Sequence, residues 1–174
     1  AVYDGTSAIM LSGESAAGKY PVEAVATMAQ IAERTEQHTS YRERFYKTEF
    51  KIRNNLDAIS HATCAMAIDV DAKGIVVCSV SGKTAGMVSR YRCPTDIVGM
   101  TTDEKVWRRL NLSWGVTPVL ADEYSSMDVM FYNGLANAKK YLGLKEGDAV
   151  VLTGGPINGK RGNTNTIKVE VIEK

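Results

Sequence analysis

The feature that most constrains the fold is a short apolar run, IVVC at residues 75–78, followed at once by SVSGKT at residues 79–84. Three of the four apolar residues are β-branched, which is typical of a strand buried in a parallel sheet. Helical spacing begins directly after the polar residues, over residues 85–91. A strand, a polar turn and a helix in this order predict an α/β domain.

The polar turn has the composition of an anion-binding site. Free backbone N–H groups and the positive end of the helix dipole meet at such a turn, and Lys83 adds a full charge. We therefore predict a phosphate-binding turn. Its candidate residues are Ser79, Ser81, Gly82, Lys83 and Thr84.

The turn can also be interpreted as a nucleotide-binding Walker loop or as an ordinary helix cap. A Walker loop would need glycine at the position of Val77, so the sequence holds only the Gly-Lys-Thr half of that nucleotide motif. The turn can also be an ordinary strand-to-helix connection, in which Ser81 or Thr84 only caps the helix. The turn alone does not decide between a cap and a phosphate site.

Composition limits the kinds of partner. The chain has 174 residues, and its 21 basic and 20 acidic side chains give a net charge of +1 with no basic block. We expect no nucleic-acid partner, and any anion site must be local. No window approaches the roughly 18 apolar residues of a membrane span, so we expect no membrane partner.

Cysteine and histidine usage predicts a cytoplasmic protein without a metal site of its own. The three cysteines are irregularly spaced, and an odd number argues against a secreted disulfide framework. Neither His38 nor His61 has a partner at metal-ligand spacing.

The first 37 residues resemble the end of a larger βα array. Residues 7–11 form an apolar run that predicts a buried strand, which would deliver Ser12 and Glu14 into a loop of small residues. Pro21 then begins a helix that we expect to reach Arg34. A parallel strand at this position needs neighbouring strands that the chain itself does not supply.

Residues 38–54 are predicted to be a partly helical connector to a domain that begins with a helix capped by Asn55. In that domain, strands and helices alternate, and Ser125 with Asp128 predicts a capping box for the longest helix. The expected strands after the first are 96–101, 116–120, 148–153 and 166–172, and the expected helices between them are 103–111 and 126–142. The last strand follows its predecessor through a loop alone, so we expect it to be antiparallel. The prediction is a three-layer αβα domain with a mostly parallel five-stranded sheet and an antiparallel edge strand.

The loop between the last two strands is a second candidate anion site. Residues 154–165 contain four glycines, one lysine and one arginine, at the carboxyl end of a strand of the same sheet. The alternative is a solvent-exposed hairpin tip. Together with the first turn, the loop suits a ligand with two separated phosphates. Its candidate residues are Gly159, Lys160, Arg161, Gly162, Asn163 and Thr164.

Three segments carry a resemblance to pyruvate kinases. Residues 4–25 resemble the last strand and helix of the pyruvate kinase barrel. The SGKT turn, with YRCP at residues 91–94, resembles the effector-binding turn and the Arg-Tyr-Arg-Pro segment of the C-terminal domain, from which Cys93 departs. Residues 162–169 resemble the closing loop and strand, and the glycine-rich loop is of the longer, bacterial type.

The resemblance implies a C-terminal part of a pyruvate kinase. Residues 1–37 would be the last βα unit of the catalytic TIM barrel, 38–54 the connector and 55–174 the effector-binding domain. The parent enzyme would transfer a phosphoryl group between phosphoenolpyruvate and ADP, with Mg²⁺ and K⁺ held by residues upstream. Ser12 would take part in the proton path to the enolate, and Glu14 would shape the pyruvate end. The piece alone is expected to be inactive and to hold no cofactor.

The resemblance also implies a regulatory role. A sugar phosphate or nucleotide would bind both loops, and contacts in a homotetramer or the connector would transmit the effect. Members activated by fructose 1,6-bisphosphate use a tryptophan and an arginine before the long helix. This chain has Tyr124 and no arginine there, which counts against that bisphosphate and leaves a monophosphate or AMP. The alternatives are a freestanding phosphate-binding module without catalysis and an inactive domain kept for oligomer contacts.

We predict that Lys83→Ala weakens phosphate-ligand binding by about 1.5 to 3 kcal/mol, because a charge-assisted hydrogen bond is lost. Calorimetric titration with glucose 6-phosphate measures the change. An unchanged affinity would place the phosphate away from Lys83.

Overall fold

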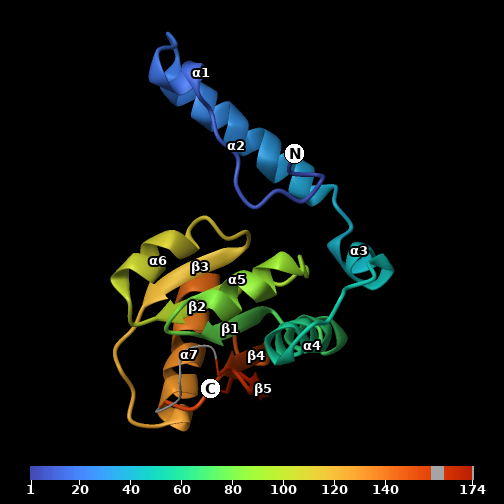
Figure 1. Cartoon of the computed structure of the whole chain (residues 1–174), viewed down its shortest axis with the longest axis vertical. Coiled ribbons are helices and arrows are strands. Elements are labelled where there is room, and N and C mark those ends of the chain that lie inside the picture. Colours follow the sequence, from blue (N-terminus) through green and yellow to red (C-terminus); the bar gives the residue numbers. More distant parts are fainter. Residues whose placement is uncertain (158–162, 174) are drawn as a thin grey trace.

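The computed structural model describes residues 1–157 and 163–173. A connected series of helices and strands begins with two helices at the amino end and continues into an αβα domain (Figure 1). The helices are α1 (Gly13–Ala16), α2 (Pro21–Gln37), α3 (Tyr41–Lys47), α4 (Asn55–Asp69), α5 (Lys83–Arg90), α6 (Glu104–Leu110) and α7 (Met127–Leu142). The strands are β1 (Gly74–Cys78), β2 (Ile97–Thr101), β3 (Val116–Leu120), β4 (Ala149–Gly154) and β5 (Thr166–Val171).

The five strands form one sheet in the order β3-β2-β1-β4-β5. β1 pairs in parallel with β2 and β4, and β2 pairs in parallel with β3. β5 runs antiparallel to β4 at the edge, with Thr153 opposite Ile167. The predicted fold class, with its antiparallel edge strand, is confirmed.

Helices cover both faces of the sheet, and β1 supplies side chains to both layers. Ile75 and Val77 point into a core that they share with α4, α5 and α6. Val76 and Cys78 point into the opposite core, against α7. All five residues of β1 are buried, which explains the continuous apolar run from which the fold was predicted.

Two of the predicted helix caps are wrong by one residue. The side chain of Asn54, not of Asn55, accepts a hydrogen bond from the Asp57 N–H at 2.9 Å. Ser126, not Ser125, caps α7 by accepting from the Val129 N–H at 3.2 Å. In both cases the residue before the first helical one has extended backbone angles, which aim its side chain at the first turn.

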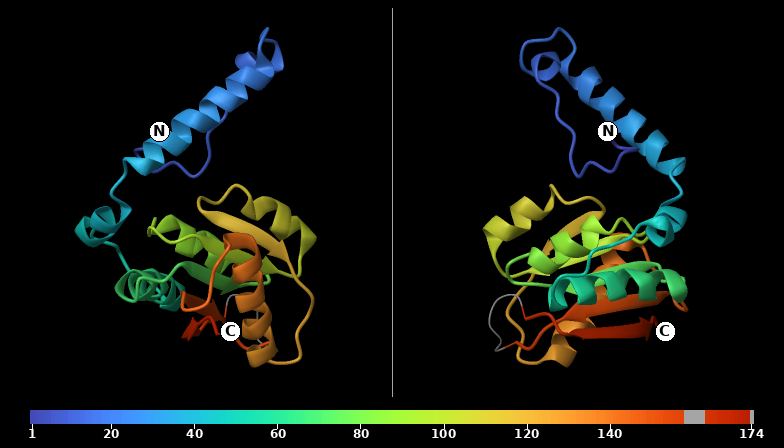
Figure 2. Two further views of the ribbon diagram at one scale, coloured as in Figure 1. Left: turned by 180° about the vertical axis from the view of Figure 1, so that it is seen from behind. Right: turned by 45° about the vertical axis from the view of Figure 1, so that its right-hand side comes forward.

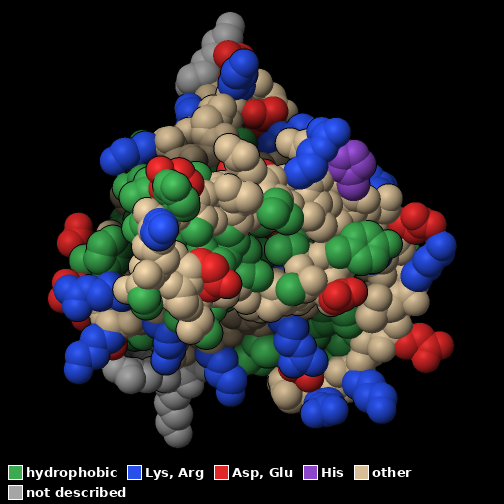
Figure 3. Space-filling view, turned by 90° about the horizontal axis from the view of Figure 1, so that it is seen from above, with side chains coloured by type: hydrophobic (Ala, Val, Ile, Leu, Met, Phe, Trp, Pro, Cys, Tyr) green, Lys and Arg blue, Asp and Glu red, His purple; other side chains and the backbone are tan. Residues whose placement is uncertain are grey.

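The predicted strand over residues 7–11 is wrong for this chain. These residues have no strand partner and are mostly exposed, because a strand needs a neighbour to satisfy its backbone groups. α1 and α2 extend away from the domain (Figures 1 and 2). Met10, Val22 and Ile31 are 85%, 76% and 61% exposed. Hydrophobic side chains are visible near the centre of the face seen from above (Figure 3).

The connector is anchored to the domain by aromatic packing. Phe45 of α3 is buried, and its ring stacks on His61 of α4 at 5.1 Å and contacts Phe50 at 5.4 Å. At the end of α2, Glu36 accepts a hydrogen bond of 2.7 Å from the Trp114 indole N–H. α2 is therefore tied to the domain at its carboxyl end.

Two helical glycines provide a matched test of the packing between α7 and the sheet. A Cβ at Gly134 of α7 would lie 2.9 Å from Val76 Cγ1, whereas a Cβ at Gly86 of α5 would meet nothing within 4 Å. Both alanine substitutions gain similar helix propensity. We predict that Gly134→Ala is less stable than Gly86→Ala by about 1 to 3 kcal/mol, because only the first overpacks the core. Urea unfolding measures both, and equal stabilities would contradict the packing described.

Candidate ligand-binding site

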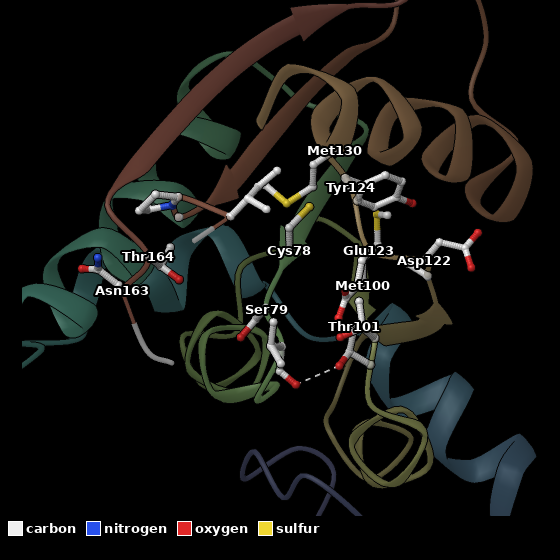
Figure 4. Close-up of a pocket in the computed structure, with 16 residues that line it drawn as sticks. Cys78, Ser79, Met100, Thr101, Asp122, Glu123, Tyr124, Met130, Asn163 and Thr164 are labelled. Atoms are coloured by element: carbon white, nitrogen blue, oxygen red, sulfur yellow. Dashed lines mark hydrogen bonds between the residues drawn. The ribbon is translucent and has the colours of Figure 1, made fainter. Parts of the chain in front are cut away.

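A hollow of about 380 Å³ lies at the edge of the sheet where the four parallel strands end (Figure 4). The segments that follow β1, β2, β3 and β4 all reach this edge, because parallel strands have their carboxyl ends on the same side. The lining comprises Cys78, Ser79, Val80, Met100, Thr101, Thr102, Ala121, Asp122, Glu123, Tyr124, Met130, Gly155, Pro156, Ile157, Asn163 and Thr164.

The turn after β1 adopts its path because of Gly82. The Ser79 N–H donates to the Met100 carbonyl at 2.9 Å, and the Gly82 N–H donates back to the Ser79 carbonyl at 3.1 Å. Gly82 is left-handed, with φ of 70°, and a Cβ there would lie 2.6 Å from Val106 Cγ1. Glycine meets both the conformational and the spatial requirement. α5 therefore begins at Lys83, directly beside the hollow.

A hydrogen bond joins the two predicted anion loops. Thr84 Oγ1 lies 2.7 Å from Thr164 Oγ1, and the two residues are 80 positions apart in the sequence. Both side chains are buried. Thr84 therefore does not cap α5; its hydroxyl ties the helix start to the segment before β5.

Gly155 allows the chain to close the hollow on its β4 side. A Cβ at this position would lie 2.2 Å from the Asn163 carbonyl oxygen and 3.2 Å from the Thr164 Cα. Both neighbours are backbone atoms, which cannot move aside as a side chain can. The close approach of the two segments depends on the glycine.

The structure brings some of the predicted binding residues together and not others. Ser79, Asn163 and Thr164 line the hollow, and Thr84 contacts it through Thr164. Ser81 and Gly82 form the adjacent turn without lining the hollow, and the Ser81 hydroxyl accepts a long hydrogen bond, 3.4 Å, from the Lys83 N–H. The predicted residues Gly159, Lys160, Arg161 and Gly162 lie outside the described residues.

Lys83 lies in a different hollow from Ser79 and Thr164. It lines a shallow depression between α4 and α5 together with Arg53 and Arg90. The first residue of a helix can project to either side of the strand that precedes it, and sequence spacing does not fix that choice. Lys83 is placed with two other cations instead of with the hydroxyls.

Ser12 and Glu14 lie at the start of α1, far from this hollow (Figure 1). The Ser12 N–H donates to Glu14 Oε2 at 3.2 Å. Hydrogen bonds from the backbone N–H groups of Glu14 and Ser12 hold the pKa of the Glu14 carboxyl below its usual range. Both residues are exposed.

The part of the lining that follows β2 and β3 was not among the binding residues predicted from the sequence. Thr101 donates to the Val80 carbonyl at 2.9 Å, which fixes the turn from a neighbouring strand. Asp122 and Glu123 line the hollow after β3, next to Tyr124. The sequence does indicate these residues, because polar residues that follow one parallel strand reach the same edge of the sheet as those that follow the neighbouring strands.

Burial affects the protonation of two titratable side chains that line the hollow, Cys78 and Tyr124. The pKa of Cys78 is raised to about 12 by burial. The pKa of Tyr124 is raised by burial and, at pH values where these groups are ionised, by the negative charges of Cys78 and Asp122. Both groups are protonated at neutral pH. Among the described residues, no cluster of His, Cys, Asp and Glu side chains could hold a metal ion.

These features define a three-layer αβα domain with a ligand-sized hollow at the carboxyl edge of its parallel strands. Residues 57–170 match the family model described as "Pyruvate kinase, alpha/beta domain". The chain is 41% identical to the pyruvate kinase of Clostridium acetobutylicum, 43% to that of Geobacillus stearothermophilus and 41% to that of Lactobacillus delbrueckii subsp. bulgaricus, each over 99% of this chain. The chain belongs to the pyruvate kinase family and contains its C-terminal α/β domain.

The chain spans about a third of the length of these relatives, 37% of the Clostridium protein and 30% of the other two. Within the described part of the chain, no helix has the length and apolar character that crossing a bilayer requires.

The raised pKa of Cys78 predicts an unreactive thiol. At pH 8, a pKa of about 12 leaves a thiolate fraction of about 10⁻⁴, compared with roughly 0.2 for an unperturbed cysteine. Iodoacetamide should therefore alkylate Cys78 about a thousandfold more slowly in the folded chain than in urea. Peptide mapping by mass spectrometry follows this site separately. Equal rates would contradict the burial of Cys78.

Proposed function

We propose that the hollow binds a phosphorylated metabolite and that the chain is the effector-binding part of a pyruvate kinase. The observation that carries this proposal is the Thr84–Thr164 hydrogen bond, which holds the helix-start turn against the segment before β5. Two polar loops that are remote in sequence thus meet at one ligand-sized hollow.

Neutral donors would bind the phosphoryl group. Ser79, Asn163 and Thr164 line the hollow, and their side chains carry hydroxyl and amide groups that can donate hydrogen bonds. The first turn of α5, which Thr84 joins to Thr164, leaves N–H groups without partners inside the helix and carries the positive end of the helix dipole. Lys160 and Arg161, which lie outside the described residues, would add charge.

The catalytic activity of the parent enzyme is part of the proposal. It would transfer a phosphoryl group between phosphoenolpyruvate and ADP, and Ser12 and Glu14 would lie at the edge of its active site. Mg²⁺ and K⁺ would be held by other parts of the parent chain. The apolar residues exposed on α2 fit this arrangement, because the rest of a barrel would cover them.

Regulation would need a route from the hollow to catalysis. α2 is joined to the domain through residues 38–54 and through the Trp114–Glu36 hydrogen bond. A conformational change in the domain can therefore be transmitted to α2. Subunit contacts of a homotetramer would provide a second route. A freestanding module without catalysis would use the same hollow but would have no catalytic site to regulate.

Thr164→Val tests the site directly. Removing the hydroxyl deletes a donor in the hollow and leaves the buried Thr84 hydroxyl without its partner. We predict that the affinity for glucose 6-phosphate falls about five- to tenfold, that is about 1 to 1.4 kcal/mol. Calorimetric titration measures it.

Thr166→Val is the matched control, because Thr166 does not line the hollow and, among the described residues, its hydroxyl donates only to Asn165 Oδ1, at 3.1 Å. Its affinity should equal that of the unmodified chain. The proposal fails if the unmodified chain binds none of glucose 6-phosphate, AMP and inorganic phosphate.

A further inference from the structure

Two of the three cysteines meet in the core that α4 and α5 form with the sheet. Cys64 lies on α4, Cys93 lies in the segment between α5 and β2, and both are buried in the same apolar cluster. Their thiols are within hydrogen-bonding reach of each other. Cys78 packs in the core on the opposite face of the sheet. The fold therefore pairs two thiols that are remote in sequence and keeps the third apart.

Hydrogen bonds orient the two sulfur atoms and make Cys93 the better nucleophile. The Cys64 thiol donates to the Val88 carbonyl at 3.6 Å, and Cys93, as a thiol, donates to the Thr95 carbonyl at 3.9 Å. The hydrogen bond with Cys64 lowers the pKa of Cys93, whereas the hydrogen bond with Cys93 and burial raise the pKa of Cys64 well above its usual value. Because the thiolate is the reactive form, Cys93 attacks an oxidant and Cys64 is the resolving thiol.

Cys93 lies next to the surface although its own side chain is buried. Of its two neighbours, Arg92 is partly exposed and Pro94 is exposed. Arg92 has a φ of 54°, a left-handed conformation that is strained for a residue with a side chain. The chain between α5 and β2 is neither helix nor strand, so it opens locally at a lower free-energy cost than the sheet does. Such an opening admits a small oxidant to Cys93 without unfolding the domain.

We propose that Cys64 and Cys93 form a peroxide-sensitive dithiol that closes to a disulfide and locks α4 to the segment after α5. That segment includes Arg92, whose guanidinium lies over the Trp114 ring at 4.8 Å and donates to the Ser7 hydroxyl at 2.9 Å. The disulfide therefore acts on contacts that join the domain to the amino-terminal residues. Neither cysteine lines the hollow at the strand ends, so this site does not depend on the ligand proposed there.

Hydrogen peroxide balances the reaction. The Cys93 thiolate attacks one peroxide oxygen, the O–O bond breaks, and the leaving hydroxide takes up the proton that Cys93 has lost. The Cys64 sulfur then attacks the sulfenic acid on Cys93; the S–S bond forms, the S–O bond breaks, and the released hydroxide takes the Cys64 proton. Two thiols and one peroxide give one disulfide and two water molecules. The sulfur pair loses two electrons, which the peroxide gains.

Peptide mapping of the 174-residue chain tests the dithiol. The folded chain is treated with hydrogen peroxide at pH 7, the remaining thiols are alkylated in urea, and tryptic peptides are analysed by mass spectrometry without reduction. We expect the peptides of Cys64 and Cys93 to be joined, and this pair to be oxidised at least tenfold faster than Cys78. Dithiothreitol should release both thiols. Oxidation should raise the melting temperature by roughly 5 to 10 °C, because the bond closes a long loop in the unfolded chain.

Two variants separate the roles of the cysteines, and circular dichroism checks that both are folded. Cys78→Ala is the matched control, because it removes a buried cysteine from the other core. It should form the Cys64–Cys93 disulfide at the unmodified rate. Cys64→Ala removes the resolving thiol, so Cys93 should stop at the sulfenic acid, which dimedone labels.

Three results would overturn the proposal. Free thiols at Cys64 and Cys93 after Cys78 has been oxidised would show that the pair is not the sensitive site. Disulfides that include Cys78 in the folded chain would show that the cores open without preference. A Cys64–Cys93 disulfide that lowers the melting temperature would show that the bond strains the native packing instead of locking it.

Discussion

The hydrogen bond between the buried hydroxyls of Thr84 and Thr164 is the interaction on which the candidate site depends. Each hydroxyl would be costly to bury alone, so each stabilises the position of the other. The bond fixes the start of α5 relative to the segment that enters β5. The hollow lies beside this junction, which gives its donor side a defined shape before any ligand arrives.

The parallel sheet determines where that junction can form. β1 lies at the centre of the sheet and is buried on both faces. It runs parallel to β2 and β4, and β3 runs parallel to β2, so the carboxyl ends of four strands lie at one edge. Two glycines then permit approaches that no other residue allows. At Gly82 the chain turns into α5 in close contact with the Val106 side chain. At Gly155 the backbone lies in close contact with the backbone of Asn163. The polar residues of the hollow are thus positioned by apolar packing and by the absence of two side chains.

The sequence predicted the parts of the fold that local pattern controls. The strand at residues 116–120 was predicted with its observed ends, and the antiparallel edge followed from a connection without a helix. The prediction of a strand at residues 7–11 was wrong, because a strand forms only beside other strands and the local sequence pattern does not show whether they are present. At the site, Ser79 and Thr164 were found from their loops, whereas Asp122 needed the strand order. The side to which Lys83 projects could not be read from spacing, because it depends on the packing of α5 against α4.

The proposed function requires that a phosphoryl group binds at the carboxyl ends of the parallel strands. A crystal structure of the chain with glucose 6-phosphate tests it most directly. We predict phosphate density between Ser79 and Thr164, with the Thr84–Thr164 hydrogen bond intact. Phosphate density only beside Lys83, Arg53 and Arg90, in the hollow between α4 and α5, would contradict it.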